Sequence, residues 1–251
     1  MPEPATAALA LPNLPTTLSQ EMQTPSSRDV LRADQRRRLL NAMATIIARD
    51  GFHGARIQDV AREARVSLRT FYAEFENKEQ CFLALHLELT AAVIEHVNAS
   101  LDFDQPWKEV MRQGFKTYYR SLASVPRMTR AVSLELGTLS DEARQQRDQV
   151  MGDFATMLVD LVERGRQLHP EIPSQSLSYM MARGLIGAVT ELIDSAVVRG
   201  ETETITDLVD TTTEMLWRLV THVEPSTQAT AHPPKSGESG IVPDQGADVR
   251  R

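Results

Sequence analysis

Cysteine is almost absent from this sequence of 251 residues, in which Cys81 stands alone. A single cysteine excludes an internal disulfide framework and suits a reducing cytoplasm, where we expect the protein to reside. Aromatic residues are also scarce, at 5% of the chain. Cys81 falls in the apolar stripe of an expected helix, so we interpret it as a small buried hydrophobic residue, with a redox-sensing thiol as the alternative.

Long apolar runs and a basic leader are lacking too. The most apolar stretch, residues 185–198, is interrupted by Glu191 and Asp194, whereas a membrane-spanning helix needs about 18 uninterrupted apolar residues. No Lys or Arg precedes Arg28, so the N-terminus lacks the basic region of a secretory signal. We therefore expect a soluble protein without membrane attachment.

Sequence motifs of catalysis and metal binding are missing as well. The chain has no G-x-S-x-G, phosphate-binding loop, H-E-x-x-H or Glu-x-x-His. Its six histidines show no i, i+4 pairing of the kind that holds a metal on a helix. We therefore expect neither an enzyme nor a bound metal or cofactor.

Charge is present but unevenly distributed. Residues 28–80 contain eleven Lys and Arg against eight Asp and Glu, although the whole chain has a formal net charge of -7. An acidic chain thus carries a locally basic N-terminal part. This asymmetry favours a polyanionic partner for that part, and a merely solvated surface is the alternative.

Apolar residues recur at helical spacing through most of the chain, and no useful length alternates with period two. This pattern predicts an all-α fold. The ends, residues 1–30 and 224–251, are rich in Pro, Ser, Thr and Gly and are expected to be flexible tails. Gly51 is expected to end the first helix in a left-handed cap. Between the tails we expect helices at about 34–49, 57–64 and 66–75, from Asn77 onward, and at 106–123, 126–138, 141–168, 174–199 and 203–222.

The stretch V-S-L-R-T-F-Y-A-E-F, residues 66–75, divides its side chains between two faces. Phe71 and Phe75 lie four residues apart on one face of the expected helix, and Ser67 is placed to cap its first turn. Leu68, Arg69, Tyr72 and Ala73 are left facing outward. Two short helices joined by A-R-V-S, after a longer one, are typical of a helix-turn-helix, whose second helix fits the DNA major groove.

The segment G-F-H-G-A-R-I-Q-D-V-A-R-E-A-R-V-S-L-R-T-F-Y-A-E-F-E-N-K-E-Q-C-F, residues 51–82, resembles the N-terminal domain of tetracycline-repressor (TetR) family regulators. The resemblance implies a three-helix DNA-binding head at residues 31–80 and a larger helical effector-binding and dimerisation body at 81–223. The matching residues are Gly51, Phe52, Asp59, Val60, Ala61, Ala64, Val66, Ser67, Thr70, Tyr72, Phe75, Lys78 and Glu79.

The sequence departs from the family pattern at three positions. Arg56 stands where many members have a capping threonine, at a cost of about 1 kcal/mol. Arg65 replaces the usual turn glycine, at a cost of roughly 1 to 2 kcal/mol if the backbone remains left-handed. Phe71 replaces a commoner leucine and enlarges the core contact. Both arginines add positive charge where a DNA backbone would pass.

The resemblance also implies roles for individual residues. The outward face of the recognition helix would meet base edges, its arginine forking onto guanine, while a second set would hold phosphates. Arg36, Arg37 and Arg38 would lie near the DNA backbone. The expected base contacts are Gln58, Leu68, Arg69 and Ala73, and the expected phosphate contacts are Arg56, Ser67, Thr70, Tyr72 and Lys78.

The body is expected to hold an effector pocket and a dimer seam. Helical spacing by itself indicates only a core for the pocket set, and a monomer whose last helices cover its own core is the alternative to the dimer. The expected pocket residues are Trp107, Met111, Phe115, Tyr118, Tyr119, Met128, Phe154 and Met157. The expected interface residues are Leu177, Met181, Gly184, Ala188, Leu192, Leu216 and Leu219.

Together these observations favour a one-component transcriptional regulator, with repression as the preferred mode. It would bind a palindromic double-stranded DNA operator as a homodimer and be released by an apolar small-molecule effector. The alternative is a helix-turn-helix protein with a non-specific DNA-architectural or protein-contact role and no effector. The operator, the effector, the regulated genes and the sign of regulation leave no trace in the sequence.

Overall fold

The computed structural model describes residues 26–222, and all of their regular structure is helical, which confirms the expected all-α fold. The expected tails lie outside this range except for residues 26–30, four of which are helical. The helices are α1 (Ser27–Gly54), α2 (Ile57–Glu63), α3 (Leu68–Glu74), α4 (Lys78–Ser100), α5 (Trp107–Ala123), α6 (Pro126–Arg130), a π-helical turn (Ala131–Leu136), α7 (Gly137–Leu139), α8 (Asp141–Leu168), α9 (Tyr179–Val198), a 3₁₀ segment (Thr202–Leu208) and α10 (Val209–Thr221).

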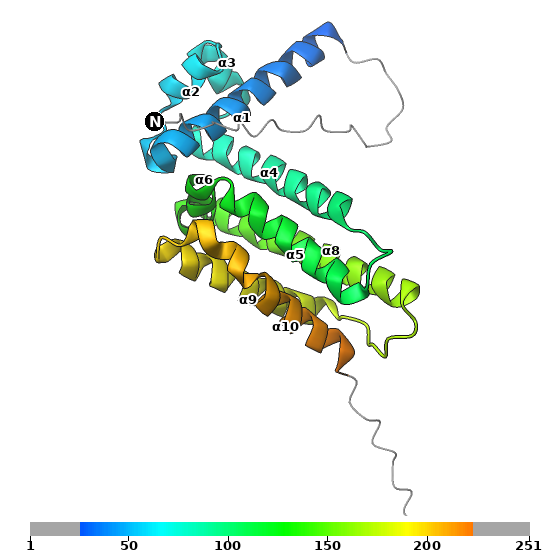
Figure 1. Cartoon of the computed structure of the whole chain (residues 1–251). Coiled ribbons are helices and arrows are strands. Elements are labelled where there is room, and N and C mark those ends of the chain that lie inside the picture. Colours follow the sequence, from blue (N-terminus) through cyan, green and yellow to red (C-terminus); the bar gives the residue numbers. More distant parts are fainter. Residues whose placement is uncertain (1–25, 223–251) are drawn as a thin grey trace, which may run out of the picture.

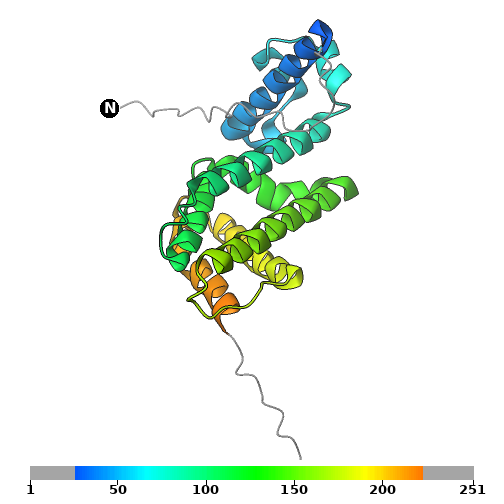
Figure 2. The same cartoon turned by 90° about the vertical axis from the view of Figure 1, so that its right-hand side faces the viewer.

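The helices form an N-terminal head and a larger body (Figure 1). The head consists of α1, α2 and α3, and α4 leads from it along the body, whose other helices lie below α4 in Figures 1 and 2. One hydrophobic core joins α1–α4 to Met128, Ala131, Leu136 and Ala143. A second core lies between α5, α8, α9 and α10. The first core therefore connects the head physically to the upper end of the body.

Helix α1 begins seven residues before the expected start at residue 34. Ser26 caps it: its hydroxyl accepts from the Asp29 amide at 3.2 Å, and the Asp29 carboxylate accepts from the Ser26 amide in return. Such a capping box satisfies amides that a helix start leaves unpaired. At the other end, Gly51 interrupts the helix with φ 74° and ψ 169°. This is a glycine conformation, but it differs from the left-handed cap that we expected.

The expected helix 126–138 contains a π-helical turn at residues 131–136. In an uninterrupted α-helix, position 135 would share a face with Met128 and Ala131, which are buried in the first core. That would direct Glu135 into the core. The wider π turn advances the register by one residue, so that Leu136, with no exposed surface, takes the place instead.

Residues 174–178, expected to begin the next helix, are not helical. The main-chain amide of Gln175 donates to the Val220 carbonyl at 2.8 Å, and its side-chain amide donates to the Leu219 carbonyl at 2.9 Å. These carbonyls belong to the last turn of α10, where a helix lacks internal donors. Helix α9 starts only after Ser178, whose hydroxyl accepts from the Met181 amide.

A sharp turn at Gly200 ends α9, and the expected helix 203–222 is divided into the 3₁₀ segment and α10. Gly200 adopts φ 76° and closes the turn through two amides, Gly200 to Val197 and Glu201 to Ala196. Across residues 26–222, none of the helices is long and apolar enough to cross a membrane.

Candidate DNA-binding and effector sites

The recognition helix α3 is held by one buried side chain and one cap. Phe71 is fully buried, whereas Leu68 is 42% and Tyr72 56% exposed. The Ser67 hydroxyl accepts from the Thr70 amide at 3.0 Å and lies 2.9 Å from the Thr70 hydroxyl. Local spacing therefore turns one face of this short helix inward and leaves the other free for a partner.

The turn between α2 and α3 fixes the angle at which α3 is presented. Arg65 has φ 55°, and two amides close the turn, from Arg65 to the Arg62 carbonyl at 3.1 Å and from Val66 to the Ala61 carbonyl at 3.0 Å. This pair of bonds is the Schellman motif, which favours glycine at the left-handed position. The left-handed backbone anticipated at Arg65 is thus retained despite its side chain.

The departure from the family pattern at Arg56 also has the expected local effect. Arg56 precedes α2, and its side chain makes no capping hydrogen bond. The start of α2 therefore lacks the acceptor that a threonine would supply. The Arg56 side chain is exposed, as is that of Gln58 in the first turn of α2.

Arginines of α1 brace the head from behind. Arg38 donates to the Ala64 carbonyl at 3.2 Å, at the end of α2, and Arg32 pairs with Glu74 of α3 at 2.6 Å. The Arg36 guanidinium lies 4.8 Å from the centre of the Phe75 ring. Helix α1 thereby supports both ends of the helix-turn-helix.

Lys78, an expected phosphate contact, is engaged inside the chain. Its ammonium donates to the Phe52 carbonyl at 3.0 Å and lies 4.3 Å from the centre of the Phe52 ring. Partial burial lowers the pKa of this lysine, while the nearby Glu135 carboxylate opposes that shift. A DNA phosphate that bound this ammonium would have to share it with the Phe52 carbonyl, which already accepts a hydrogen bond from it.

The expected DNA contacts therefore fall into two groups. One is exposed, and the other, Thr70 and Lys78, is half-buried. The exposed group is Arg56, Gln58, Ser67, Leu68, Arg69, Tyr72 and Ala73.

The expected pocket residues are divided among different places. Trp107, Met111, Phe115 and Tyr119 are buried in the second core, and Met128 is buried in the first. Tyr118 packs edge-on against Phe154, with ring centres 5.5 Å apart. Of the eight, Met157 alone lines any of three cavities that follow α4 in the described part of the chain. The other seven pack against neighbouring side chains, and their role as effector contacts stays a prediction.

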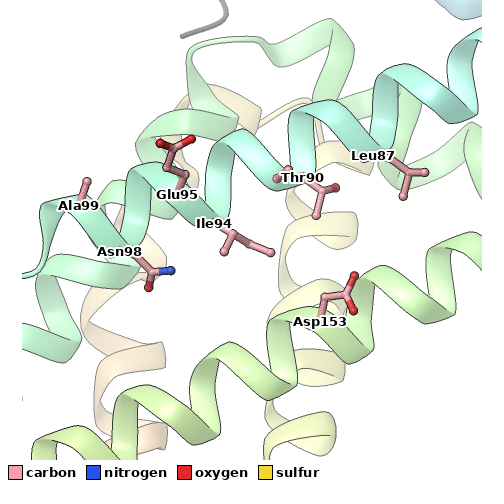
Figure 3. A pocket seen from close by; sticks show the side chains of 8 residues that line it. Leu87, Thr90, Ile94, Glu95, Asn98, Ala99 and Asp153 are labelled. Carbon is pink, nitrogen blue, oxygen red and sulfur yellow. The ribbon is translucent and has the colours of Figure 1, made fainter. Parts of the chain in front are cut away.

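These three cavities follow α4 and together form what we call the α4–α8 groove. The upper one, about 560 Å³, reaches Glu74 and Phe75 at the end of the recognition helix and shares Leu87 and Ala91 with the middle one. The middle one, about 670 Å³, shares Ile94, Asn98 and Asp153 with the lower one, about 630 Å³. Figure 3 shows side chains of α4 facing Asp153 of α8 across this space. The sequence signal that could have found it is the run of small or apolar residues on the outer face of α4, Leu87, Ala91 and Ile94.

Hydrogen bonds link α4 to α8 along the upper end of the groove. Gln146 of α8 donates to the Leu83 carbonyl at 2.9 Å and lies 3.1 Å from Nδ1 of His86, both on α4. Gln80 donates to Glu142 at 2.8 Å. His86 is buried, and burial, aided by the positive charge of Arg147, lowers its pKa to about 4. Cys81 is buried nearby, and burial raises the pKa of its thiol to about 12, so this thiol is not activated.

The expected dimer residues lie on two different surfaces. Leu177 and Leu216 are covered by their own chain and belong to the second core. Met181, Gly184, Ala188 and Leu192 follow one face of α9 and are exposed or half-buried, and Leu219 of α10 is half-buried. Tyr179 and Met180, which the sequence did not single out, add exposed apolar surface at the start of α9, with Met180 74% exposed.

The fold and the exposed face of α3 define a helix-turn-helix protein with an all-helical body. Residues 39–85 match the family model described as bacterial regulatory proteins, tetR family. The head of the chain is therefore similar to the DNA-binding domain of tetR-family regulators.

Relatives of known type extend the similarity over the body. The chain is 24% identical over 179 residues to a fatty acid metabolism regulator protein of Bacillus subtilis, covering 71% of this chain and 91% of that one. The structure of the fatty acid degradation regulator FadR from Bacillus halodurans superposes with a TM-score of 0.60 at 22% identity, over 72% and 94% of the two chains. FadR from Bacillus subtilis, solved in complex with stearoyl-CoA, superposes at 0.58 with 23% identity, over 72% and 96%. At identities below 25%, these two structures show that the chain shares their fold.

Proposed function

We propose that this protein represses transcription by binding a palindromic operator as a homodimer, and that a small molecule with an apolar part releases it. The observation that carries the proposal is the division of α3, where Phe71 is fully buried and Leu68, Arg69, Tyr72 and Ala73 are all exposed. A seven-residue helix that buries one side chain and presents four is arranged to contact a partner.

Base and phosphate contacts have separate roles in this proposal. Arg69 forks onto the O6 and N7 of a guanine, and Leu68 and Ala73 contact thymine methyl groups, with Gln58 as a further base contact. Phosphates position the head without reading sequence. Their proposed partners are Arg56, Ser67, Thr70, Tyr72 and Lys78.

A homodimer supplies the second recognition helix that a palindrome requires. Its proposed surface is the face of α9 formed by Met181, Gly184, Ala188 and Leu192, with Leu219 beside it. Among residues 26–222, no atom beyond the neighbouring residues and backbone of α9 lies within 4 Å of where a Cβ of Gly184 would be, so a partner helix can approach closely there. Leu177 and Leu216 support this face from within.

The effector site that we propose is the α4–α8 groove. Its upper cavity reaches Phe75, the residue that follows α3, and residues of α4, so a molecule in the groove lies against the helix that connects head and body. A relative solved with stearoyl-CoA supports an effector with a long apolar chain. Release requires only that the effector bind better to the dimer shape that misfits DNA, by a few kcal/mol of coupling.

The test is fluorescence-anisotropy binding to the DNA upstream of the protein's own gene and to scrambled DNA over a range of salt. We expect a preference of roughly 10³ or more for the specific site. Arg69→Ala should lower this preference about 10-fold or more, because one bidentate base contact contributes about 1 to 3 kcal/mol. Tyr72→Phe should weaken binding to both DNAs.

Arg120→Ala is the matched control, because Arg120 is an exposed arginine of the body and its loss changes the net charge equally. If Arg120→Ala weakened binding as much as Arg69→Ala, the attraction would be one of overall charge. Equal affinity for both DNAs would favour the non-specific architectural role. Analytical ultracentrifugation of wild type and Ala188→Glu tests the dimer, which the glutamate should disrupt.

A further inference from the structure

The face of α1 that packs into the head core changes its chemistry along the helix. Leu39 and Met43 lie on this face and are fully buried. Towards the start of α1, in steps of three or four residues, the same face carries Arg36, Arg32 and Arg28. An apolar face packs on the chain's own core, whereas a row of arginines is suited to an anionic partner.

The basic part of this face extends beyond the packing of the chain. Residues 26–33 are all exposed, and none of them belongs to either hydrophobic core. They nevertheless begin the helix, because Ser26 and Asp29 form its capping box. In Figures 1 and 2, α1 accordingly begins at the end of the molecule that is farthest from helices α5–α10. The protein thus forms a charged helical end that adds nothing to its cores.

An ion pair attaches this end of α1 to the recognition helix. Arg32 pairs with Glu74, the last residue of α3, at 2.6 Å, and the Glu74 side chain is only 6% exposed. Glu74 comes directly after Tyr72 and Ala73, which are exposed and are proposed DNA contacts. The start of α1 is therefore held at the end of the helix that would enter the major groove.

Arg28 extends the basic face by one further turn. It lies four residues before Arg32, which places it about 6 Å further along the helix axis. The nearby acids are engaged elsewhere, since Asp29 accepts from the helix cap and Asp34 pairs with Arg37 at 2.8 Å. Among residues 26–222, no carboxylate lies within salt-bridge distance of Arg28. Its guanidinium is therefore available to a phosphate.

We propose that the start of α1 is an additional DNA-binding element, in which Arg28 binds a backbone phosphate beside the major groove that α3 enters. Arg32 acts as the brace that positions it through Glu74. This inference rests on the proposed function, since it extends the same DNA interface to a segment outside the helix-turn-helix. Phosphates have the same charge in every sequence, so the contact adds affinity without adding specificity.

The experiment measures binding of the full chain and of Arg28→Ala to the upstream DNA and to scrambled DNA by fluorescence anisotropy over a range of salt. We expect Arg28→Ala to bind both DNAs several-fold more weakly at low salt and to keep the preference between them. The plot of log affinity against log salt should become shallower by about 0.9 for each lost contact, hence by about 2 for a homodimer. An unchanged slope would overturn the proposal.

Three control variants isolate the charge of Arg28. Arg28→Lys keeps the charge and should preserve the slope. Arg120→Ala removes an exposed charge of the body, and Val30→Ala removes apolar surface from another face of the same helical end, where Val30 is 55% exposed. Neither should weaken DNA binding, and an equal loss in either would overturn the proposal. Circular dichroism verifies that each variant is folded.

A chemical change in the DNA tests the contact itself. Ethylation interference with wild type and with Arg28→Ala should identify one phosphate in each half-site at which only wild type is sensitive. A neutral methylphosphonate at that position should weaken binding of wild type several-fold and leave Arg28→Ala unchanged, because the two groups form one contact. Independent, additive losses would show that Arg28 does not bind this phosphate and would overturn the proposal.

The same measurements separate this inference from the proposed function. If wild type prefers its operator and Arg28→Ala has an unchanged slope, the inference fails and the regulator function stands. If wild type binds both DNAs equally and Arg28→Ala has a shallower slope, the phosphate contact stands and the specific regulator function fails. Absence of DNA binding by wild type would overturn both.

Discussion

Helices α3 and α9 differ in how many of their residues are buried. Of the seven residues of α3, one is buried, and its possible contacts with a partner are side chains that the fold leaves outside. Helix α9 has 20 residues, and its six buried positions pack into the second core. The head therefore acts through the identity of a few exposed residues, whereas the body acts through the spaces and faces that its packing creates. Substitutions of exposed residues in α3 should therefore change recognition more than stability, whereas substitutions of buried residues in the body should change stability first.

The largest expected effect is on the head core. Phe71→Ala should destabilise the head by about 3 to 5 kcal/mol, because it removes a fully buried aromatic ring. Both tryptophans of the chain, Trp107 and Trp217, lie in the body with ring centres 5.9 Å apart. In thermal unfolding we expect an early loss of circular dichroism that tryptophan fluorescence does not follow.

Leu216→Ala provides the matched truncation in the body, where it should shift the fluorescence transition by a similar amount. If Phe71→Ala instead moved both signals together, head and body would unfold as one unit. That result would mean that the two cores, although built from different residues, are coupled strongly. Met128 and Leu136, which belong to the body but pack in the first core, would provide the connection.

A second prediction concerns the close contact between α5 and α8. A Cβ added at Gly165 would overlap the indole of Trp107, which is fully buried. Gly165→Ala should therefore destabilise the protein by about 1 to 3 kcal/mol through overpacking and change the tryptophan emission. Gly187→Ala is the control, since a Cβ there meets no atom of another element within 4 Å in the described part of the chain. Unchanged stability and emission of Gly165→Ala would show that α5 and α8 pack less closely.

A third prediction is a pH dependence that arises where α4 meets α8. Burial and Arg147 lower the pKa of His86 to about 4 from 6.5, so the unfolded chain binds a proton more readily than the folded one. Stability from the neutral imidazole is complete above pH 6.5 and falls as the pH drops towards 4, by about 2 kcal/mol at pH 5. Urea unfolding at pH 7, 6 and 5 measures it.

His86→Gln should remove this pH dependence, while His96→Gln, at an exposed position of the same helix, should leave it intact. A wild-type free energy of unfolding that stayed constant between pH 7 and 5 would mean that His86 is accessible to protonation in the folded state. Its contact with Gln146 would then be less enclosed than the 3.1 Å separation indicates.

The sequence predicts a region well when the interactions that shape it join residues close together in the sequence, and poorly when they join distant residues. The caps at Ser67 and Asn77 and the buried place of Phe71 depend on residues three or four positions apart, and local spacing was enough to predict them. The π turn at Ala131–Leu136 instead depends on which side chain, Glu135 or Leu136, packs into the first core. Most of that core comes from helices α1–α4, which are distant in the sequence. The extended chain at Gln175 depends on the carbonyls of α10, 44 residues away.

The same reasoning explains the pocket residues. Aromatic and methionine side chains at helical spacing identify apolar surface, but spacing does not tell whether another helix covers that surface. Here α9 and α10 pack with Trp107 and Tyr119 in one core. The residues around the groove are smaller or polar, such as Ala91 and Asn98, and their position beside a cavity arises only from the placement of α4 against α8.

The smallest expected effect compares one turn in the head with the same turn in the body. Both α2 and α9 end in a Schellman motif, with Arg65 at φ 55° in one and Gly200 at φ 76° in the other. A side chain at the left-handed position costs roughly 1 to 2 kcal/mol. Arg65→Gly removes this strain but increases the backbone entropy of the unfolded chain, so we expect a gain of about 1 kcal/mol or less.

Arg65→Ala is the decisive control, because it removes the charge and keeps the strain, and it should not stabilise the protein. Gly200→Ala should destabilise the body by the amount that Arg65→Gly gains in the head. DNA affinity distinguishes a further role: if the Arg65 charge assists binding at the phosphate backbone, Arg65→Gly and Arg65→Ala will weaken it equally, and more so at low salt. A glycine variant that were no more stable than the alanine variant would mean that the α2–α3 turn relaxes around its arginine, and the two turns would then differ in geometry as well as in sequence.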